Sequence, residues 1–431
     1  MSYARKLLLL LGDTGMFLLA SVGMLSLRFG YPIRQNVFEA HKLALFFYFI
    51  LTVLLLYIFN LYDTRYARPS TQTVRNIILG LLSSLIGGFL LFYLIPTSVS
   101  PKTNLFILVG FFGIGFFLWR ILFFRIFSNK FKTPLAIVGD SPLAKTLTEE
   151  LALHPHVGFS VLGSFTTVQQ ALQMLPRGGV LVYEQHLSAD DLVLVAQTHT
   201  RVLNIRDAYQ TILYKIPLEL VDDTLALSIL EYKENSLHFI FRRLLEIVCA
   251  SILIIITFPI TLITSIAILL EDGTPIFYKQ LRVGKRKQNF YIYKFRSMKV
   301  MNADGGAETN GAVWASSNDP RVTRVGTLIR KLHIDEIPQM INIIRGDIAL
   351  VGPRPERPTF VSSLENDLPY YFLRHTITPG FTGWAQIMFR YARTTLDAKE
   401  KYEYDLYYIY NRSLFIDIGI LLKTIQIIFT H

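Results

Sequence analysis

The sequence predicts a membrane protein in three parts: four N-terminal transmembrane helices, a parallel α/β domain, and a C-terminal region with one further long apolar segment. Two observations lead to this prediction. The 431 residues are 52% hydrophobic, which is high for a soluble protein, and the apolar residues gather in long runs. After residue 132 the runs give way to alternating strand and helix signals, the pattern of a parallel sheet.

Four apolar segments of about 20 residues each are long enough to span a bilayer. They cover residues 7–27, 42–60, 76–95 and 104–124, within a transmembrane domain that we place at 1–132. The first segment is too long for a cleavable signal peptide and lacks a small-residue cleavage site. Basic residues precede the first span and follow the fourth, including Arg5, Lys6, Arg125, Lys130 and Lys132. This charge distribution favours a cytoplasmic location for both ends of the four-helix unit.

Residues 133–230 are predicted to form a small parallel α/β domain. The stretch that begins "TPLAIVGDSPLAKTLTEELAL" indicates a strand, a turn and a helix, and "GGVLVYE" indicates a later strand. The turn "GDSPLA" has only Gly139 of the three glycines of a dinucleotide fingerprint, and no acidic residue follows at the ribose-binding distance. We interpret the domain as a degenerate Rossmann-like (CoA-binding-like) one, with nucleotide binding and a structural or docking role as the alternatives.

The third region, residues 231–431, contains the apolar segment 244–270, which is interrupted by Pro259. Basic residues flank it on both sides, with Arg242 and Arg243 before it and eight Lys or Arg between 279 and 299. A crossing would place one basic flank outside the cell, so we predict a re-entrant hairpin bent near Pro259. The final apolar stretch, 413–429, is either a helix on the membrane surface or a helix that faces the core.

The overall charge and the cysteine content exclude some classes of function. The net charge of +11 suits a protein that lies on anionic lipid or handles phosphates, and the high apolar content argues against nucleic-acid binding. The single cysteine, Cys249, excludes a disulfide framework and a cysteine-based metal site.

The stretch "LHIDEIPQ" at 332–339 holds two adjacent carboxylates, Asp335 and Glu336. Asp335 could simply cap the helix predicted after it. Several cations in turn-rich segments favour a second interpretation: Lys294, Arg296, Arg321, Arg330 and Arg354. Cations stabilise phosphate oxygens, and carboxylates hold a divalent cation or attack phosphorus, so this grouping predicts phosphoryl transfer.

The C-terminal region resembles the bacterial sugar transferase family, the monotopic phosphoglycosyl transferases. The matching segments are "GTPIFYKQLRVGKRKQNFYIYKFRSM", "SNDPRVTRVG", "LIRKLHIDEIPQMINIIRGDIALVGPRPE" and "ITPGFTGWAQI". The four predicted spans and the Rossmann-like domain are similar to the long form of that family, which includes undecaprenyl-phosphate glucose and galactose phosphotransferases. The resemblance implies a mainly α-helical α/β catalytic domain with a re-entrant membrane helix.

The resemblance also implies a reaction. A UDP-sugar donates its sugar 1-phosphate to undecaprenyl phosphate, UMP leaves, and the lipid-diphosphate sugar starts the assembly of an exopolysaccharide, O-antigen or capsule. Asp335 would be the nucleophile, Glu336 would position the phosphate or a Mg²⁺ ion bound by both acids, and Lys294, Arg330 and Arg354 would bind phosphates. The expected location is the bacterial cytoplasmic membrane with the catalytic domain facing the cytoplasm. Self-association, the sugar and the glycan are left open.

Two positions depart from the family pattern. Phe258 replaces the usual serine before the membrane proline, and Glu246 replaces an aspartate in the helix that leads into the membrane. The loss of the serine removes a side chain that could satisfy backbone carbonyls freed at the kink, a role that Thr257 could take over. Because every residue with a predicted chemical role lies after residue 236, we expect a 236–431 fragment to retain activity.

Three other functions are less consistent with the sequence. A membrane-anchored nucleotide-sugar dehydratase would need an intact glycine-rich turn and a Tyr-x-x-x-Lys pair, and neither occurs. A scaffold or regulator of polysaccharide assembly would have no need for the acidic pair and its cations. A processive glycosyltransferase would usually carry an Asp-x-Asp motif, which is absent.

Overall fold

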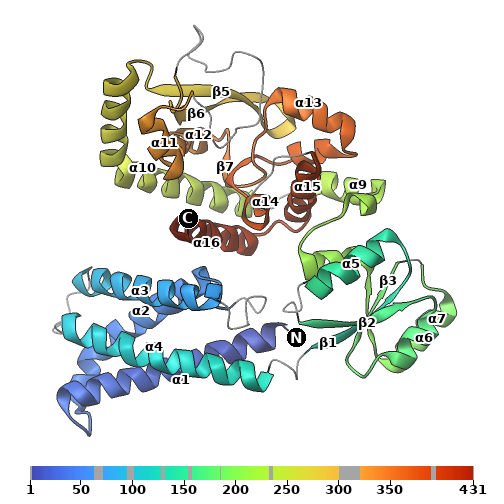
Figure 1. The fold of residues 1–431 in the computed structure, drawn as a ribbon, viewed down its shortest axis with the longest axis horizontal. Helices are drawn as coiled ribbons and strands as arrows, with labels where there is room; N and C mark the ends of the chain where they lie inside the picture. Colours follow the sequence, from blue (N-terminus) through green and yellow to red (C-terminus); the bar gives the residue numbers. More distant parts are fainter. Residues whose placement is uncertain are drawn as a thin grey trace. The chain divides into compact units, whose positions relative to one another are not determined.

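The computed structural model of the protein describes residues 2–62, 71–94, 101–127, 132–153, 158–184, 186–232, 236–299, 321–389 and 395–430. The chain forms two compact units, Met1–Ala208 and Tyr209–His431. Figure 1 colours their elements along the sequence from blue to red. The first unit holds the N-terminal helices and the parallel α/β domain, and the second holds the acidic pair.

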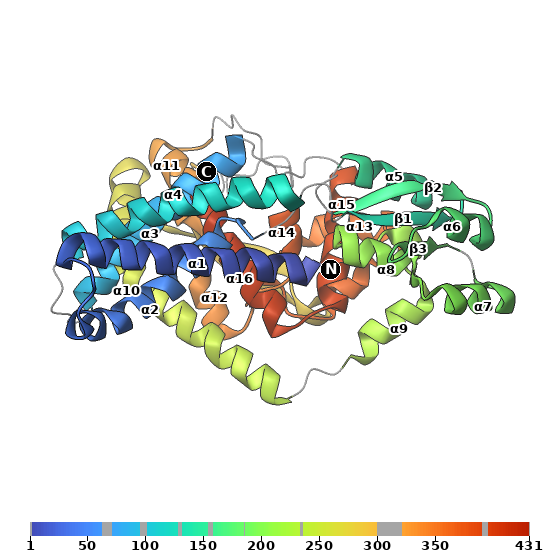
Figure 2. The same cartoon turned by 90° about the horizontal axis from the view of Figure 1, so that it is seen from below.

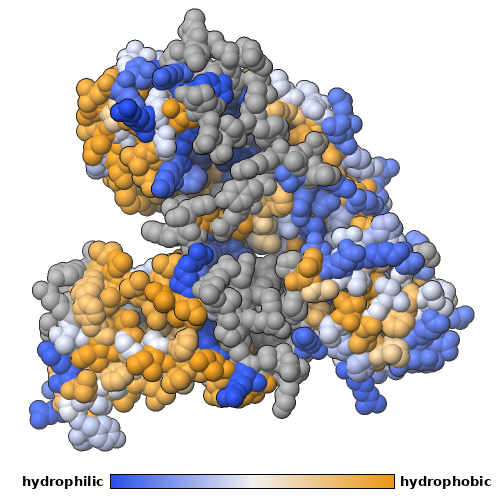
Figure 3. Space-filling view, in the orientation of Figure 1, coloured by the Kyte–Doolittle hydropathy of each residue, from blue (hydrophilic) through white to orange (hydrophobic). Residues whose placement is uncertain are grey.

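Four long apolar helices form the N-terminal part, as predicted. They are α1 (Ser2–Phe29), α2 (Gln35–Ile58), α3 (Thr71–Leu94) and α4 (Pro101–Phe127). Each contains a segment that is long and apolar enough to cross a membrane, and Phe239–Asp272 of the second unit is a fifth such segment. Figure 3 shows that hydrophobic residues cover much of the visible face of the N-terminal helices. Leu19, Phe46 and Ile86 are among the large apolar side chains exposed on these helices. The protein is therefore membrane-associated, while the count of four crossings stays a prediction.

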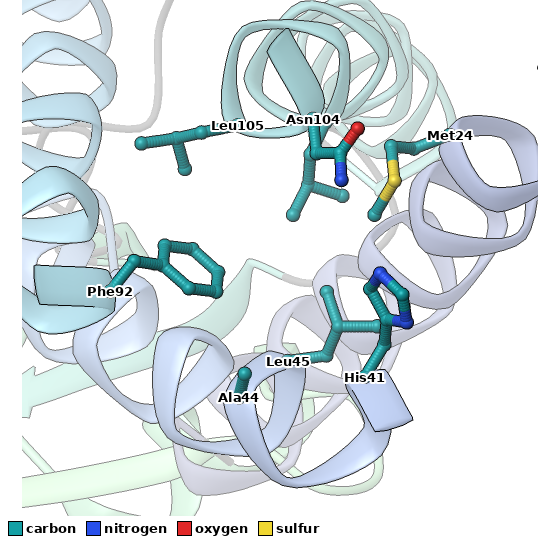
Figure 4. A pocket seen from close by; sticks show the side chains of 8 residues that line it. Met24, His41, Ala44, Leu45, Phe92, Asn104 and Leu105 are labelled. Atoms are coloured by element: carbon teal, nitrogen blue, oxygen red, sulfur yellow. The ribbon is translucent and has the colours of Figure 1, made fainter. Parts of the chain in front are cut away.

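The interior of this helical part contains a buried ion pair. Arg120 Nη2 of α4 donates to Asp13 Oδ2 of α1 at 2.7 Å, and both residues are buried. Charged groups in membrane helices are costly unless they face a partner, so this pair fixes α1 against α4. A small pocket elsewhere in the bundle is lined mainly by apolar side chains, with His41 and Asn104 as its polar members (Figure 4).

The predicted parallel α/β domain is confirmed. Its elements are β1 (Thr133–Val138), α5 (Pro142–Leu153), β2 (Phe159–Phe165), α6 (Val168–Met174), β3 (Val180–Tyr183), α7 (Ala189–Thr198), β4 (Arg201–Asn204) and α8 (Ile205–Ala208). The four strands are parallel in the order β2-β1-β3-β4. Buried Ala136, Ala171 and Leu181 lie in the core between the sheet and its helices.

The turn between β1 and α5 is occupied by a side chain of the protein itself. Ser141 N, at the start of α5, donates to Glu184 Oε2 at 3.3 Å, and a Cβ at Gly139 would lie 2.4 Å from that oxygen. In dinucleotide-binding domains a pyrophosphate binds at this helix N-terminus. A pyrophosphate here would meet the Glu184 carboxylate, so the geometry favours the structural or docking interpretation over nucleotide binding.

The second unit is mainly helical and carries two small two-stranded sheets. Its helices are α9 (Asp223–Glu231), α10 (Ser236–Asp272), α11 (Arg324–Lys331), α12 (Gln339–Arg345), α13 (Pro358–Asp367), α14 (Trp384–Met388), α15 (Thr395–Tyr410) and α16 (Leu414–Thr430). Strands β5 (Phe277–Val283) and β6 (Asn289–Phe295) are antiparallel, whereas β7 (Ala349–Val351) and β8 (Gly380–Thr382) are parallel. Ile343, Leu373, Leu406 and Ile420 are fully buried in the core that joins these elements.

The segment that precedes α10 belongs to the second unit. Side chains from this segment lie in the same core as α12 and α15: Ile216, Leu218, Leu225, Ala226 and Ile229. Trp384 Nε1 donates to Tyr214 O at 3.0 Å, and Lys399 Nζ donates to Glu219 Oε1 at 2.6 Å. Residues 209–230, predicted to be part of the Rossmann-like domain, pack instead with the second unit. The domain borders themselves stay predictions.

This packing changes the expectation for fragments of the chain. We expect the 236–431 fragment to unfold at a lower temperature than a 209–431 fragment, because it exposes the core surface that Ile216, Leu225 and Ile229 cover. Each such side chain contributes roughly 1.5–3 kcal/mol on burial. Thermal unfolding of both fragments in the same detergent measures the difference. Equal unfolding temperatures would show that residues 209–235 add nothing to the stability of the second unit.

Helix α10 contains the predicted hairpin segment as one helix of 37 residues with Pro259 inside it. Figures 1 and 2 show two arms of this helix that meet at an angle. Proline has no N–H to donate, so the carbonyl four residues earlier loses its helical partner. Thr257, the proposed substitute for the serine, donates instead to Leu253 O at 2.7 Å. The hydroxyl of Thr257 therefore does not satisfy the carbonyl that Pro259 leaves free.

Glu246, the other departure from the family pattern, lies at a junction between α10 and α12. Its Oε2 accepts a hydrogen bond from Arg243 Nη1 at 3.2 Å. Arg243 also donates to the carbonyls of Ile343 and Ile344, each at 2.7 Å. The longer glutamate thus supports the arginine that binds the last turn of α12.

The two interpretations of the C-terminal apolar stretch are partly resolved. One face of α16 packs on the core through Ile420, and Asp417 Oδ1 accepts a hydrogen bond from Tyr408 Oη at 2.7 Å. Phe415 and Ile418 are exposed on the same helix. The helix is therefore core-facing on one side, and contact of its exposed side with lipid stays a prediction.

Candidate active site

The acidic pair lies in a 3₁₀ turn, Ile334–Glu336, between α11 and α12. The turn follows His333, whose φ of 55° reverses the chain after α11. Helix α12 begins after Pro338, and no side chain caps it. The interpretation of Asp335 as the cap of this helix is therefore wrong, and another role must explain the carboxylate.

Glu336 is the centre of an ion-pair cluster. Its Oε1 accepts hydrogen bonds from Lys294 Nζ at 2.7 Å and from Arg354 Nη2 at 2.8 Å. Burial alone would raise the pKa of Glu336, but the charges of Arg354 and Lys294 outweigh it and hold the pKa well below its usual range. Glu336 is thus a permanent anion that holds two cations in place.

Asp335 has a different environment from its neighbour. Burial raises the pKa of Asp335; the positive charge of Lys294 opposes the increase, and the Glu336 charge adds to it. Within the described parts of the chain, no group donates a hydrogen bond to its carboxylate. A partly desolvated carboxylate without a donor is a better nucleophile than one that is fully bonded. The two adjacent acids are therefore suited to different roles.

The cations reach the acidic pair from separate elements. Lys294 lies near the end of β6, Arg330 in the last turn of α11, and Arg354 in the loop after β7. That loop passes very close to β8, because a Cβ at Gly380 would lie 2.0 Å from Gly352 N. Glycine at this contact allows β7 and β8 to pair and brings Arg354 towards Glu336. Lys294, Arg330 and Arg354 all act electrostatically on the acidic pair.

Two predicted phosphate-binding cations lie in other surroundings. Arg296 is buried and its Nη2 donates to Asp272 O at 2.9 Å and Gly273 O at 2.8 Å, at the end of α10. Arg321 is the first residue described after position 299, and its carbonyl accepts a hydrogen bond from Lys299 N. The structure thus gives Arg296 contacts that stabilise the fold, and phosphate binding by Arg296 and Arg321 stays a prediction.

A second buried ion pair supports the site, and sequence reasoning did not find it. Arg374 Nε donates to Asp405 Oδ2 at 2.7 Å, and Arg374 Nη2 donates to the Arg354 carbonyl at 2.7 Å. Tyr371 Oη accepts from Arg374 Nη1 at 3.0 Å. Asp405 is buried on the tyrosine-rich helix α15, and its place among aromatic and apolar residues is the one weak signal that the sequence offers.

Comparison of the chain with known proteins identifies its family. Residues 237–431 match the family model described as "Bacterial sugar transferase". The chain is also 37% identical over 294 residues to the UDP-N-acetylgalactosamine-undecaprenyl-phosphate N-acetylgalactosaminephosphotransferase of Aeromonas hydrophila, covering 66% of this chain and 68% of that protein. The chain belongs to the bacterial sugar transferase family.

Other relatives match either about two thirds of the chain or a shorter part of it. The UDP-glucose:undecaprenyl-phosphate glucose-1-phosphate transferase of Escherichia coli K12 is 30% identical over 316 residues, covering 68% of this chain and 67% of that protein. A putative undecaprenyl-phosphate N-acetylgalactosaminyl 1-phosphate transferase of Bacillus subtilis is 42% identical over 142 residues, 33% of this chain and 76% of that protein. The predicted family and the prediction of a transferase are confirmed, and the dehydratase alternative is not supported.

Proposed function

We propose that this sugar transferase moves a sugar 1-phosphate from a UDP-sugar to undecaprenyl phosphate, releasing UMP and forming the lipid-diphosphate sugar that primes a surface polysaccharide. The observation that carries the proposal is the division of roles in the acidic pair. Glu336 holds Lys294 and Arg354 beside Asp335, whose own carboxylate receives no hydrogen bond from the described residues. The activities after which the Aeromonas and Escherichia relatives are named support the same reaction.

The chemistry divides into two displacements at one phosphorus atom. In the first, an Asp335 oxygen bonds to the β-phosphorus of the UDP-sugar, the bond from that phosphorus to the bridging oxygen breaks, and UMP leaves. In the second, an oxygen of undecaprenyl phosphate bonds to the same phosphorus, and the Asp335 carboxylate leaves. Lys294 and Arg354 stabilise the negative charge on the phosphoryl oxygens in both steps.

The donor set of the site fits a magnesium ion. The described residues include no group of three His, Cys, Asp or Glu side chains that could hold a metal by themselves. Magnesium usually binds through one or two carboxylates, with substrate phosphates and water as the remaining ligands. Asp335 and Glu336 provide such a pair, and a Mg²⁺ ion held there would offset the charge of the diphosphate.

A panel of donors tests the proposed function directly. Purified protein in nanodiscs would be given undecaprenyl phosphate and either UDP-N-acetylgalactosamine, UDP-N-acetylglucosamine, UDP-glucose or UDP-galactose, and UMP release would be measured. We expect release with at least one donor, dependent on undecaprenyl phosphate and on Mg²⁺. No release with any donor, from protein that melts cooperatively, would contradict the proposal.

We also propose that α10 enters and leaves the membrane on the cytoplasmic side, as a re-entrant hairpin bent at Pro259. The bend seen in Figure 1 and the exposed apolar side chains along both arms, such as Leu244, Ile255 and Ile263, support it. The protein would lie in the bacterial inner membrane. This path keeps its catalytic unit in the cytoplasm, where nucleotide sugars are made. It also holds the acidic pair near the lipid headgroups.

Labelling with a membrane-impermeant thiol reagent tests this path. In a Cys249→Ser background, single cysteines at Ser236 and Gln288 should both be protected in intact cells and react after permeabilisation, because both flanks lie inside. A cysteine at Arg34, in the predicted external loop between α1 and α2, is the positive control for surface labelling. Labelling of position 288 alone in intact cells would establish a crossing.

A further inference from the structure

Asn342 is a fully buried polar side chain on α12, and it makes three hydrogen bonds. Its Oδ1 accepts from Tyr293 N at 3.0 Å. Its Nδ2 donates to Tyr291 O at 2.7 Å and to Asp347 Oδ2 at 2.9 Å. Only one orientation of the amide places its donor beside two acceptors and its acceptor beside a donor, so the side chain is fixed.

The Asn342 amide occupies the free edge of β6. Bonds at the two ends of the hairpin, Arg296 N to Ile276 O and Gly284 N to Gln288 O, show that even-numbered residues of β6 direct their backbone groups towards β5. The odd-numbered Tyr291 and Tyr293 therefore direct theirs to the other edge. The amide bonds to both of them as a neighbouring strand would, which fixes the position of β6 along α12.

This bond joins the two elements that carry the reactive groups. Lys294 follows Tyr293 directly in β6, and α12 follows the turn that holds Asp335 and Glu336. The Lys294 Nζ lies 2.7 Å from Glu336 Oε1, a separation that is sensitive to any slip of the strand along the helix. Arg345 Nη1 adds a bond to Tyr293 Oη at 2.9 Å, but Arg345 is exposed. The Asn342 amide is a buried hydrogen-bonded link between β6 and α12.

We propose that Asn342 is a positioning residue for the transfer reaction: its amide sets the register of β6 against α12 and so holds Lys294 beside the acidic pair. The expected effect of Asn342 on the reaction rate rests on the proposed function. Its structural consequence, the placement of the Lys294 amine, can be measured without any substrate. Asn342 itself touches no reacting atom.

Two substitutions separate positioning from folding. Asn342→Leu keeps the branched shape and removes all three hydrogen bonds, while Asn342→Asp keeps the acceptor for Tyr293 N and loses the donor to Tyr291 O. We expect both to lower kcat by at least about tenfold, with a smaller effect on KM, because a misplaced cation mainly weakens stabilisation of the transition state. Asn411→Leu is the matched control, since the Asn411 amide bonds to Gln210 and Tyr407 within the same unit. It should lower the unfolding temperature and leave kcat near the wild-type value.

Trace acetylation of lysines, read by peptide mass spectrometry without substrate, is the decisive measurement. Lys294 should react several-fold faster relative to the exposed Lys285 in both Asn342 variants, and at the wild-type rate in Asn411→Leu. Unchanged reactivity of Lys294 in folded Asn342 variants would overturn the proposal, as would failure of both variants to fold, because the amide would then be a determinant of folding. If the wild-type protein releases no UMP from any donor, the proposed function fails, and the acetylation result still decides the role of Asn342.

Discussion

Asp335→Asn is expected to reduce UMP release by at least about 10³-fold, because an amide oxygen cannot form the acyl phosphate that the first displacement requires. The two side chains have the same shape, and no described group donates a hydrogen bond to the Asp335 carboxylate, so the unfolding temperature should change little. UMP release and thermal unfolding of the same preparation measure the two effects. Incubation of the wild type with a UDP-sugar alone should also leave a sugar phosphate on the peptide that contains Asp335.

A true helix cap in the same unit provides the control for this substitution. Asp222 Oδ1 accepts a hydrogen bond from Leu225 N at 2.8 Å and caps α9. Asparagine caps a helix about as well as aspartate, so Asp222→Asn should preserve both stability and activity. Substantial turnover by Asp335→Asn would contradict the covalent mechanism and show that the Asp335 carboxylate is not the nucleophile.

The elements of the fold that could be predicted from sequence are those with a strong local signal. The four apolar helices follow from hydropathy alone, and the strands at 133–138 and 180–183 follow from short β-branched runs between turn residues. The placement of residues 209–232 could not be predicted in this way. The segment resembles a continuation of the α/β domain, and only its packing in the fold, with Ile216 and Leu225 in the core of the second unit, shows where it belongs.

The residues of the candidate site that could be predicted are likewise those with a local signal in the sequence. Asp335 and Glu336 are adjacent in sequence, and Lys294 and Arg354 stand in motifs that could be recognised. Arg296 lies two residues after Lys294 and would share its face if the strand continued. Arg296 lies just beyond the last residue of β6, Phe295, and its side chain binds the end of α10 instead. A strand end of this kind has no clear signal in a single sequence.

The ion pair between Arg374 and Asp405 was missed because its members are distant in sequence and each resembles an ordinary surface charge. Only the fold reveals that both are buried, with Arg374 7% and Asp405 2% exposed. Arg374→Met is expected to lower the free energy of unfolding by about 3–5 kcal/mol, since it leaves the Asp405 carboxylate buried without its cation. Thermal or denaturant unfolding in detergent measures the loss. Lys287→Met, which removes a half-exposed pair with Glu365, should cost no more than about 1 kcal/mol.

A double substitution shows whether this pair also serves the reaction. Replacing a buried ion pair by apolar side chains of similar volume is often close to neutral for stability, so Arg374→Met with Asp405→Leu should recover most of the lost free energy. Activity should not recover with it, because the Arg354 carbonyl still lacks the 2.7 Å bond from Arg374 Nη2 that fixes the loop carrying the Arg354 guanidinium. A double variant that regains both stability and wild-type kcat would show that the pair serves the fold alone. A variant that is stable but slow would show that Arg374 holds Arg354 in position against Glu336.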